Sequence, residues 1–529
     1  MITQTLFLAR AADRRPLWAL AASVLLVVLA DALFHEALPD LNDVANPLQL
    51  FTFMNYAPAW TAALFFGAFL GLLAIFRPSL LADWPGRITA LACCALMVAM
   101  VRFGGWLPFF LLAAGSATLA LHTGRWQLGV VAWIEEFALF VCRMFALPFR
   151  DWTALQRRNP AEKASRGRRL LRNWIFPLGL GFAFVGLFIL ANPLIALWIE
   201  DAVWDFLQEL ILPRRLLLWV LAGTFAWAAL RPGWAPADET SWPLDAAAGE
   251  DAPLPGESFM TPGAMTRALV LFNAIFLVQT AMDSVYLLGG SALPEGFTYA
   301  EYAHRGAYPL VATALLAGAV VLAALRPGSA TERSTPVRVL TYVWIGQNVF
   351  LVFTSAWRLA LYIEAYSLTR LRVAAFLWMG LVALGLGFLV ARMVWRWSGR
   401  MLLNANGLAL IALLLGVCFV NVDRMVADFN VDNCREMGGP GNYIDLYYLE
   451  VLGPDALPAL KKLRAAHVLG SEQQHMADYA YERLLTRLGQ ELSHWRRWTL
   501  RAWDLVEAHP RALDSLHALP QDQGWSNER

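Results

Sequence analysis

Residues 373–395 read VAAFLWMGLVALGLGFLVARMVW, and Arg392 is their single charged side chain. A helix needs about 20 mostly apolar residues to cross the roughly 30 Å hydrocarbon core of a bilayer. Within that core every backbone polar group must be paired inside its own segment, which favours a helix. The stretch therefore predicts a membrane-spanning helix and decides the fold class.

The composition of the whole chain agrees with a membrane protein. The chain has 529 residues, of which 58% are hydrophobic and 16% are charged, whereas soluble chains are about 45–50% apolar and about 25% charged. The mean hydropathy is +0.48. These values exclude a disordered protein, a secreted disulfide scaffold and a single soluble enzyme domain. The formal net charge of +1 gives no indication of a nucleic-acid partner.

The hydropathy pattern predicts an all-α fold: a polytopic helical membrane protein with about eleven transmembrane helices and a small C-terminal helical-hairpin domain. The predicted spans are 17–34, 57–76, 88–102, 105–121, 174–198, 215–230, 266–289, 308–325, 339–362, 373–395 and 402–421. The short runs 88–102 and 105–121 either turn tightly at Phe103-Gly104-Gly105 or form one long broken helix. The first run also resembles a signal peptide, and we interpret it as an uncleaved span.

Lysine and arginine in the short loops predict the orientation, because cytoplasmic loops carry more of them. The N-terminal arginines and the strongly basic segment 150–172 are expected in the cytoplasm, and the acidic stretch 199–212 outside. With eleven spans the chain starts in the cytoplasm and the C-terminal domain lies outside. Four arginines on the predicted outer side go against this rule: Arg214, Arg215, Arg370 and Arg372.

The chain divides into four parts. Residues 1–231 form a first half of six spans, in which 126–149 is expected to be an interfacial helix, with a twelfth span as the alternative. Residues 232–264 are acidic and rich in Pro, Gly and Ala, which predicts a flexible linker. Residues 265–421 form a second half of five spans, and 422–529 form the helical tail.

Turn and capping residues divide the tail into about four helices. Gly453 ends a helix over 443–452, Pro454-Asp455 opens the next one, and Gly470-Ser471 gives another stop and N-cap. An amphipathic stretch then runs to about residue 508. Five of the eight histidines lie in this tail without ligand spacing to Cys or a carboxylate, and the five cysteines form no CxxC. We therefore expect no metal, no other cofactor and no disulfide framework.

Ionisable and polar side chains gather near the outer ends of the later spans. Asp283 shares a helix face with Gln279 and Tyr286, and the loop that follows reads LPEGFTYAEYAHRGAYP over 293–309. The helix of the 339–362 span is expected to continue outward as far as Arg372. The candidate ligand-binding residues are Asp283, Glu301, Tyr302, His304, Arg305, Arg358, Tyr362, Tyr366 and Arg370. Such a set, with Glu295, Glu364 and Arg372 nearby, could bind an anionic headgroup or a phosphate.

A structural interpretation accounts for the same residues and is favoured over the ligand site. Thr298-x-x-Glu301 fits a capping box, and Glu301 with Arg305 fits an i,i+4 ion pair. The tyrosines fit an aromatic belt at the membrane interface. Asp283 and Arg358 could pair across the helix bundle.

Three motif segments resemble a known family. These are 293–318 (LPEGFTYAEYAHRGAYPLVATALLAG), 358–379 (RLALYIEAYSLTRLRVAAFLWM) and 421–460, which opens NVDRMVADFNVDNC. They resemble bacterial membrane proteins grouped as domain of unknown function 4173, related to domain 4153. The resemblance implies a bacterial inner-membrane protein and carries no activity. Residues 438–441 (GGPG) depart from the family pattern and suggest a loosened loop, which would leave Cys434 as an external thiol.

Three functions remain open, in decreasing order of preference. The first is a non-enzymatic envelope scaffold, sensor or accessory protein that contacts membrane lipids and binds a protein partner through its tail, where Trp495, Trp498 and Trp503 are available. The second is a membrane enzyme acting on a lipid-linked or phosphate-bearing substrate at the outer face. The third is a transporter. Transporters often contain repeated halves, and the two halves of this chain show no convincing repeat, which argues against this function.

Overall fold

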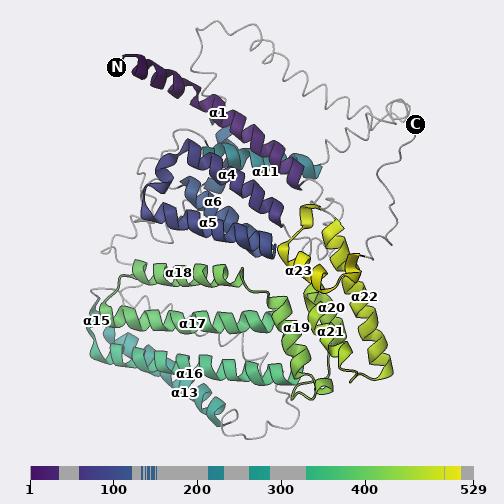
Figure 1. Cartoon of the computed structure of the whole chain (residues 1–529). Coiled ribbons are helices and arrows are strands. Elements are labelled where there is room, and N and C mark those ends of the chain that lie inside the picture. Colours follow the sequence, from purple (N-terminus) through teal and green to yellow (C-terminus); the bar gives the residue numbers. More distant parts are fainter. Residues whose placement is uncertain are drawn as a thin grey trace, which may run out of the picture. The chain divides into compact units, whose positions relative to one another are not determined.

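The computed structural model describes a helical chain in two units (Figure 1). The described residues are 2–34, 59–121, 213–230, 261–285, 329–493 and 495–513, together with most of 133–151. Helices are the only regular elements within these ranges, which confirms the all-helical class. One unit comprises 1–126 and 134–235, and the other 127–133 and 236–529.

Within the described residues of the first unit, five long helices pack on one another. They are α1 (Ile2–Phe34), α4 (Trp60–Phe76), α5 (Trp84–Arg102), α6 (Trp106–Leu121) and α11 (Pro213–Leu230). Phe69 of α4 is fully buried, and its ring centroid lies 5.0 Å from that of Phe225 in α11. Arg215 of α11, one of the arginines that went against the charge rule, forms an ion pair with Asp31 of α1. That pair explains how an arginine is accommodated there.

The short runs at 88–102 and 105–121 form a helical hairpin, which confirms the tight-turn alternative. Gly104 and Gly105 have φ of 68° and 118°, values that residues with a Cβ rarely adopt. The two helices approach so closely that a Cβ on Gly115 would lie 2.8 Å from the sulfur of Cys93.

The described part of 133–151 packs against the first unit. Phe140, Met144 and Leu147 are buried against residues of α6 and α11. The indole N–H of Trp227 donates to the carboxylate of Asp151 at 3.0 Å. One side of this helix is thus covered by protein. The choice between an interfacial helix and a twelfth span stays a prediction.

The second unit begins with five helices in chain order. They are α13 (Pro262–Asp283), α15 (Ala330–Arg333), α16 (Thr335–Tyr366), α17 (Arg370–Trp395) and α18 (Gly399–Val417). α13 packs on α16, α16 on α17, and α17 on α18. Hydroxyl caps start four of them, because the side chains of Thr261, Ser329, Thr369 and Ser398 each accept a backbone N–H of the first turn.

Among the described residues, four helices are long and apolar enough to cross a membrane: Trp84–Arg102, Thr335–Tyr366, Arg370–Trp395 and Gly399–Val417. Five shorter apolar helices, Trp18–Phe34, Trp60–Phe76, Trp106–Leu121, Arg215–Leu230 and Pro262–Val278, coincide with further predicted spans. The predicted spans 174–198 and 308–325, the basic segment 150–172 apart from Arg150 and Asp151, and most of the linker 232–264 lie outside the described residues. The total of eleven stays a prediction.

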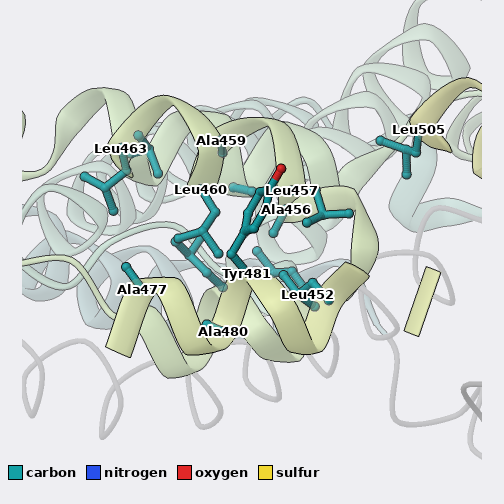
Figure 2. Packing of buried hydrophobic residues seen from close by; sticks show 14 of the residues in the cluster. Leu452, Ala456, Leu457, Ala459, Leu460, Leu463, Ala477, Ala480, Tyr481 and Leu505 are labelled. Atoms are coloured by element: carbon teal, nitrogen blue, oxygen red, sulfur yellow. The ribbon is translucent and has the colours of Figure 1, made fainter. Parts of the chain in front are cut away.

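The tail is a compact set of short helices around an apolar core (Figure 2). Its elements are α19 (Val422–Asn433), η5 (Arg435–Met437), α20 (Leu446–Leu452), η6 (Pro454–Ala456), α21 (Leu457–Ala465), α22 (Ser471–Ser493), η7 (Trp495–Arg497) and α23 (Leu500–Ala508). Leu457 and Leu460 of α21 pack against Tyr481 of α22. The stop at Gly453 is confirmed, and a helix begins at Ser471 as expected. The predicted stop at Gly470 is wrong, because α21 already ends at Ala465. The stretch to residue 508 is not continuous, because Thr499 caps a new helix by accepting the N–H of Ala502 at 3.2 Å.

Candidate functional site

The candidate site lies where the tail meets the ends of α16 and α17, and we name it the tail junction. It comprises the last turns of α16, the link 367–369, the first turn of α17, and α19 and α20. The predicted continuation of α16 to Arg372 is wrong: the helix ends at Tyr366. Ser367 reverses the chain with φ of 67°, and Thr369 caps α17 by accepting the N–H of Arg372. Arg370 and Arg372 therefore belong to a second helix.

Asn430 of α19 binds the link between the two spanning helices. Its Oδ1 accepts the N–H of Leu368 at 2.7 Å, and its Nδ2 donates to the Leu368 carbonyl at 2.9 Å. Asn430 is 6% exposed, and Leu368 and Ile363 belong to the same buried cluster as the tail core. The apolar core of the tail is thus continuous with the ends of two helices long enough to span a membrane.

Arg370 is directed at the tail. Its guanidinium pairs with Asp423 of α19 and donates to the carbonyl of Leu452 at 3.4 Å, while its backbone N–H donates to the hydroxyl of Tyr448 at 3.0 Å. The paired side chains of Arg370 and Asp423 are 43% and 29% exposed, and pairs of this kind contribute less than about 1 kcal/mol. The ion pair therefore helps to orient α17 relative to the tail. The buried contacts around Leu368 provide most of the stability of the junction.

Arg372 closes the end of α16. It donates to the carbonyls of Tyr366 and Ser367, and its guanidinium carbon lies 4.3 Å from the ring centroid of Tyr362. The rings of Tyr362 and Tyr366 lie 4.8 Å apart between centroids. The last carbonyls of a helix lack partners within it and carry partial negative charge, so a cation is stabilised there.

The structure brings together four of the nine predicted site residues. Arg358, Tyr362 and Tyr366 lie in the C-terminal part of α16, and Arg370 starts α17. Asp283 is the last residue of α13, and its side chain lies outside the described residues. Glu301, Tyr302, His304 and Arg305 also lie outside them. The capping box, the Asp283–Arg358 pair and a common ligand site therefore stay predictions.

A pocket of about 230 Å³ opens beside the tail junction. Its walls include Glu364 and Ser367 of the α16 end, Asn433 and Cys434 of the α19 end, and Asn442. No lysine or arginine is among its lining residues.

The glycine loop that forms one wall of the pocket is tightly closed, contrary to the predicted loosened loop. The N–H groups of Gly439 and Gly441 donate to the carbonyls of Cys434 and Asn433 at 2.9 and 2.8 Å. A Cβ on Gly439 would lie 2.4 Å from Asn433 backbone atoms, which explains the glycine. Cys434 is 2% exposed, so its thiol is covered by the tail, and burial raises its pKa. The location of this thiol outside the membrane stays a prediction.

The sequence analysis missed a row of polar side chains between α13 and α16. Asn273 is 8% exposed and donates to the carbonyls of Leu269 and, across to α16, of Leu340. Gln347 donates back to the Asn273 carbonyl at 3.3 Å, and Asn348 is buried. The signal was present in the sequence, since amides inside apolar runs are rare and usually face other helices. We name Asn273, Gln347 and Asn348 the amide row.

A buried charge network in the tail was also missed. Arg501 of α23 donates to Asp455 and to Glu491, both at 2.7 Å, and Asn421 donates to the other oxygen of Asp455 at 2.8 Å. Burial opposes the charge on Arg501, but Glu491 and Asp455 raise its pKa overall. Burial also raises the pKa of Glu491 against the attraction of Arg501. Within the described residues, no three His, Cys, Asp or Glu side chains come together as a metal site would require.

Apolar helices of this length, joined to a folded helical tail, define the chain as a helical protein compatible with a membrane. A family model described as "Domain of unknown function (DUF4153)" matches residues 88–463, well over half of the chain. The chain belongs to this family. The match supports the relationship to domain 4153 and supports the resemblance to domain 4173 only loosely. It reaches further toward the N-terminus than the motif segments do. No curated protein and no solved structure matches the chain.

Proposed function

We propose that the protein is a non-enzymatic membrane scaffold, sensor or accessory protein whose helical tail binds a partner protein. The observation that carries the proposal is the tail junction. Asn430 and Leu368 join the tail core to the ends of α16 and α17, so a load on the tail acts directly on two helices long enough to span a membrane. A rigid connection of this kind suits a protein that transmits a signal or anchors a partner protein.

The arginines of the junction support this function over catalysis. A phosphate-binding site needs arginine donors aimed at the ligand. Arg370 is engaged by Asp423 and by the Leu452 carbonyl, and Arg372 by two carbonyls and the Tyr362 ring. Both side chains thus already stabilise the fold.

The tail offers aromatic side chains to a partner. Tyr447 of α20 is 77% exposed and Tyr479 of α22 is 64% exposed. Tyrosine is enriched in protein interfaces because it contributes a large rigid area and a hydroxyl.

The enzyme alternative has one observation in its favour, the pocket beside the junction. The pocket contains one carboxylate residue, Glu364, and no arginine or lysine. That lining suits a phosphate-bearing substrate poorly. The transporter alternative would draw on the amide row, whose described members bond chiefly to backbone carbonyls.

A complementation experiment separates scaffold from enzyme. In a strain that lacks the gene, we expect Tyr447→Ala/Tyr479→Ala to fail to rescue the deletion defect at normal membrane levels, and Tyr447→Phe/Tyr479→Phe to rescue it. Asp283→Asn and Glu301→Gln, which remove acid–base groups, should rescue at normal levels. Failure of these two carboxylate variants at normal protein level, with rescue by the alanine variant, would instead support the enzyme.

We further propose the bacterial inner membrane as the location, with the N-terminus in the cytoplasm and the tail outside. Single cysteines at Ser291 and Ser515, in a background without native cysteines, should both react with an impermeant thiol reagent on intact cells. Absence of labelling at both would place the tail and the 293–309 loop in the cytoplasm and would contradict eleven spans.

A further inference from the structure

The segment that joins α22 to α23 carries an exposed aromatic and basic surface. Residues 495–503 read WRRWTLRAW. Trp495, Leu500 and Trp503 are 51%, 40% and 50% exposed, and the guanidinium carbon of Arg496 lies 4.7 Å from the Trp495 ring centroid. We name Trp495, Arg496, Arg497, Leu500 and Trp503 the Trp-Arg surface. It lies beyond the last residue of the family match, 463.

The charge network fixes this surface close to the end of a helix long enough to span a membrane. α18 ends at Val417, and Asn421 follows four residues later. Asn421 donates to Asp455, and Asp455 accepts from Arg501, which lies between Leu500 and Trp503. Two hydrogen bonds therefore connect the start of α23 to the residues just outside the α18 span. Arg501 and Asp455 are 15% and 10% exposed, so the connection is buried.

From this geometry we propose that the Trp-Arg surface binds anionic phospholipid headgroups of the membrane that α18 crosses. Tryptophan prefers the headgroup level of a bilayer, and basic side chains near an anionic surface contribute about fivefold each to binding. Arg496 and Arg497 are adjacent, and the segment has no acidic residue before Asp504. Both the positive charge of the Trp-Arg surface and its position near the end of α18 thus match a layer of anionic headgroups.

The buried face of α23 explains why the exposed face is available. Ala502, Leu505 and Val506 face the tail core, whereas Leu500 and Trp503 lie on another side of the same helix. A surface of apolar and basic side chains at the end of a spanning helix has a bilayer as its neighbour without any movement of the tail. The proposal therefore needs neither the partner protein nor a particular orientation of the chain.

Lipid contact can be measured on the full chain in nanodiscs. A fluorophore is attached to Trp503→Cys in a cysteine-free background, and quenching is compared between spin-labelled anionic and spin-labelled zwitterionic headgroups at equal mole fraction. A label at Met476→Cys is the positional control. Met476 is 50% exposed in the second turn of α22, at the opposite end of that helix from Trp495. We expect anionic lipid to be enriched about 25-fold at position 503 if both arginines act, since each contributes about fivefold.

Two charge variants test the assignment to Arg496 and Arg497. Arg496→Gln/Arg497→Gln should abolish the enrichment, and the lysine pair should keep it. Arg483→Gln/Arg487→Gln removes the same charge from α22, where both arginines pair with Glu450, and should leave it unchanged. Equal quenching by both headgroups, or none at position 503, would overturn the proposal. If the label at position 503 were shielded from solvent as strongly in detergent as in nanodiscs, the proposal would also be overturned, because protein would then cover the surface.

Discussion

The tail and the apolar helices of the second unit place their leucines in opposite ways. In the tail, Leu457, Leu460 and Leu484 are 0% exposed and form the core (Figure 2). In α17 and α18, Leu384 and Leu408 are 52% and 68% exposed. Water drives apolar side chains inward in the tail, whereas lipid tails are as apolar as leucine and exert no such drive between spans. The pattern of leucine burial thus fits water around the tail and is compatible with lipid around α17 and α18. The change from one pattern to the other occurs within a few residues of Asn421.

Polar groups show the complementary difference. In α13 and α16 the buried amides of Asn273 and Asn348 bond to backbone carbonyls, and the row carries no charge. In the tail, buried Arg501 and Asp455 are charged and pair with each other. Charges are costly at membrane depth, but a small water-facing domain can bury them as a paired network.

Removal of Arg501 should destabilise the tail most. Arg501→Met leaves the Asp455 and Glu491 carboxylates without their cation, and breaking a buried pair in this way costs about 3–5 kcal/mol. Pulse proteolysis of the tail in nanodiscs, across a urea series, measures the change. Arg501→Met/Asp455→Asn/Glu491→Gln should recover most of the loss. The exposed Arg487 is the control, and Arg487→Met should cost less than about 1 kcal/mol. An equal effect for Arg501→Met and Arg487→Met would contradict a buried network.

A matched pair of leucines tests the contrast directly. Leu460→Ala opens a cavity in the tail core and should lower the free energy of unfolding by about 2–5 kcal/mol. Leu408→Ala on α18 removes the same atoms from an exposed position and should cost less than about 0.5 kcal/mol. The same urea series reports on the tail, and resistance to unfolding in detergent reports on α18. A large loss for Leu408→Ala would mean that a protein surface covers it.

The leucine contrast also marks what the sequence could predict. Long apolar runs identified α16, α17 and α18, because hydropathy alone decides whether a helix can span a membrane. Gly453 predicted the end of α20 and Ser471 the start of α22, since glycine and capping residues act locally. Local signals failed at Ser367, where a helix ends at a residue without a breaker in its sequence. That break is imposed by Asn430, which is 62 residues away from Leu368.

Long-range pairing is what the sequence left open at the candidate site. The arginines at 370 and 372 were singled out as needing an explanation. The partners of Arg370, which are Asp423, Tyr448 and the Leu452 carbonyl, lie far along the chain. Arg372 instead donates to the nearby carbonyls of Tyr366 and Ser367. The charge network was hidden for the same reason, because Asp455 and Arg501 are 46 residues apart. Asn273 is different: an amide inside an apolar run was visible, and it predicts a neighbouring helix.

Loss of the amide row should have a moderate effect within the spans. Asn273→Leu removes the bond to the Leu340 carbonyl, and hydrogen bonds between membrane helices contribute about 0.6 kcal/mol on average and about 1.7 kcal/mol at most. Steric trapping in bicelles can measure the α13–α16 association. Thr341→Val is the control, because the Thr341 hydroxyl bonds to Val337 within its own helix. If Thr341→Val weakened the association as much as Asn273→Leu, the bond between the helices would not be the cause.

Acid sensitivity of the tail should depend on His509 and gives the smallest expected effect. His509 is 4% exposed, its Nδ1 lies 2.9 Å from the Leu505 carbonyl, and burial, with Lys461 and Arg424 nearby, lowers its pKa. The unfolded tail therefore binds the proton more readily than the folded tail. The contribution of neutral His509 to the stability of the tail should be fully present above the ordinary histidine pKa of about 6.5. It should fall as the pH drops from there toward the lowered pKa.

His509→Gln removes the titrating group and should flatten this part of the profile, measured by thermal proteolysis of the tail between pH 7.5 and about 5. His475 is exposed on α22, and His475→Gln should leave the profile as it is. A profile that falls equally in all three proteins would assign the acid sensitivity to the carboxylates of the tail, whose protonation would then outweigh the one buried histidine.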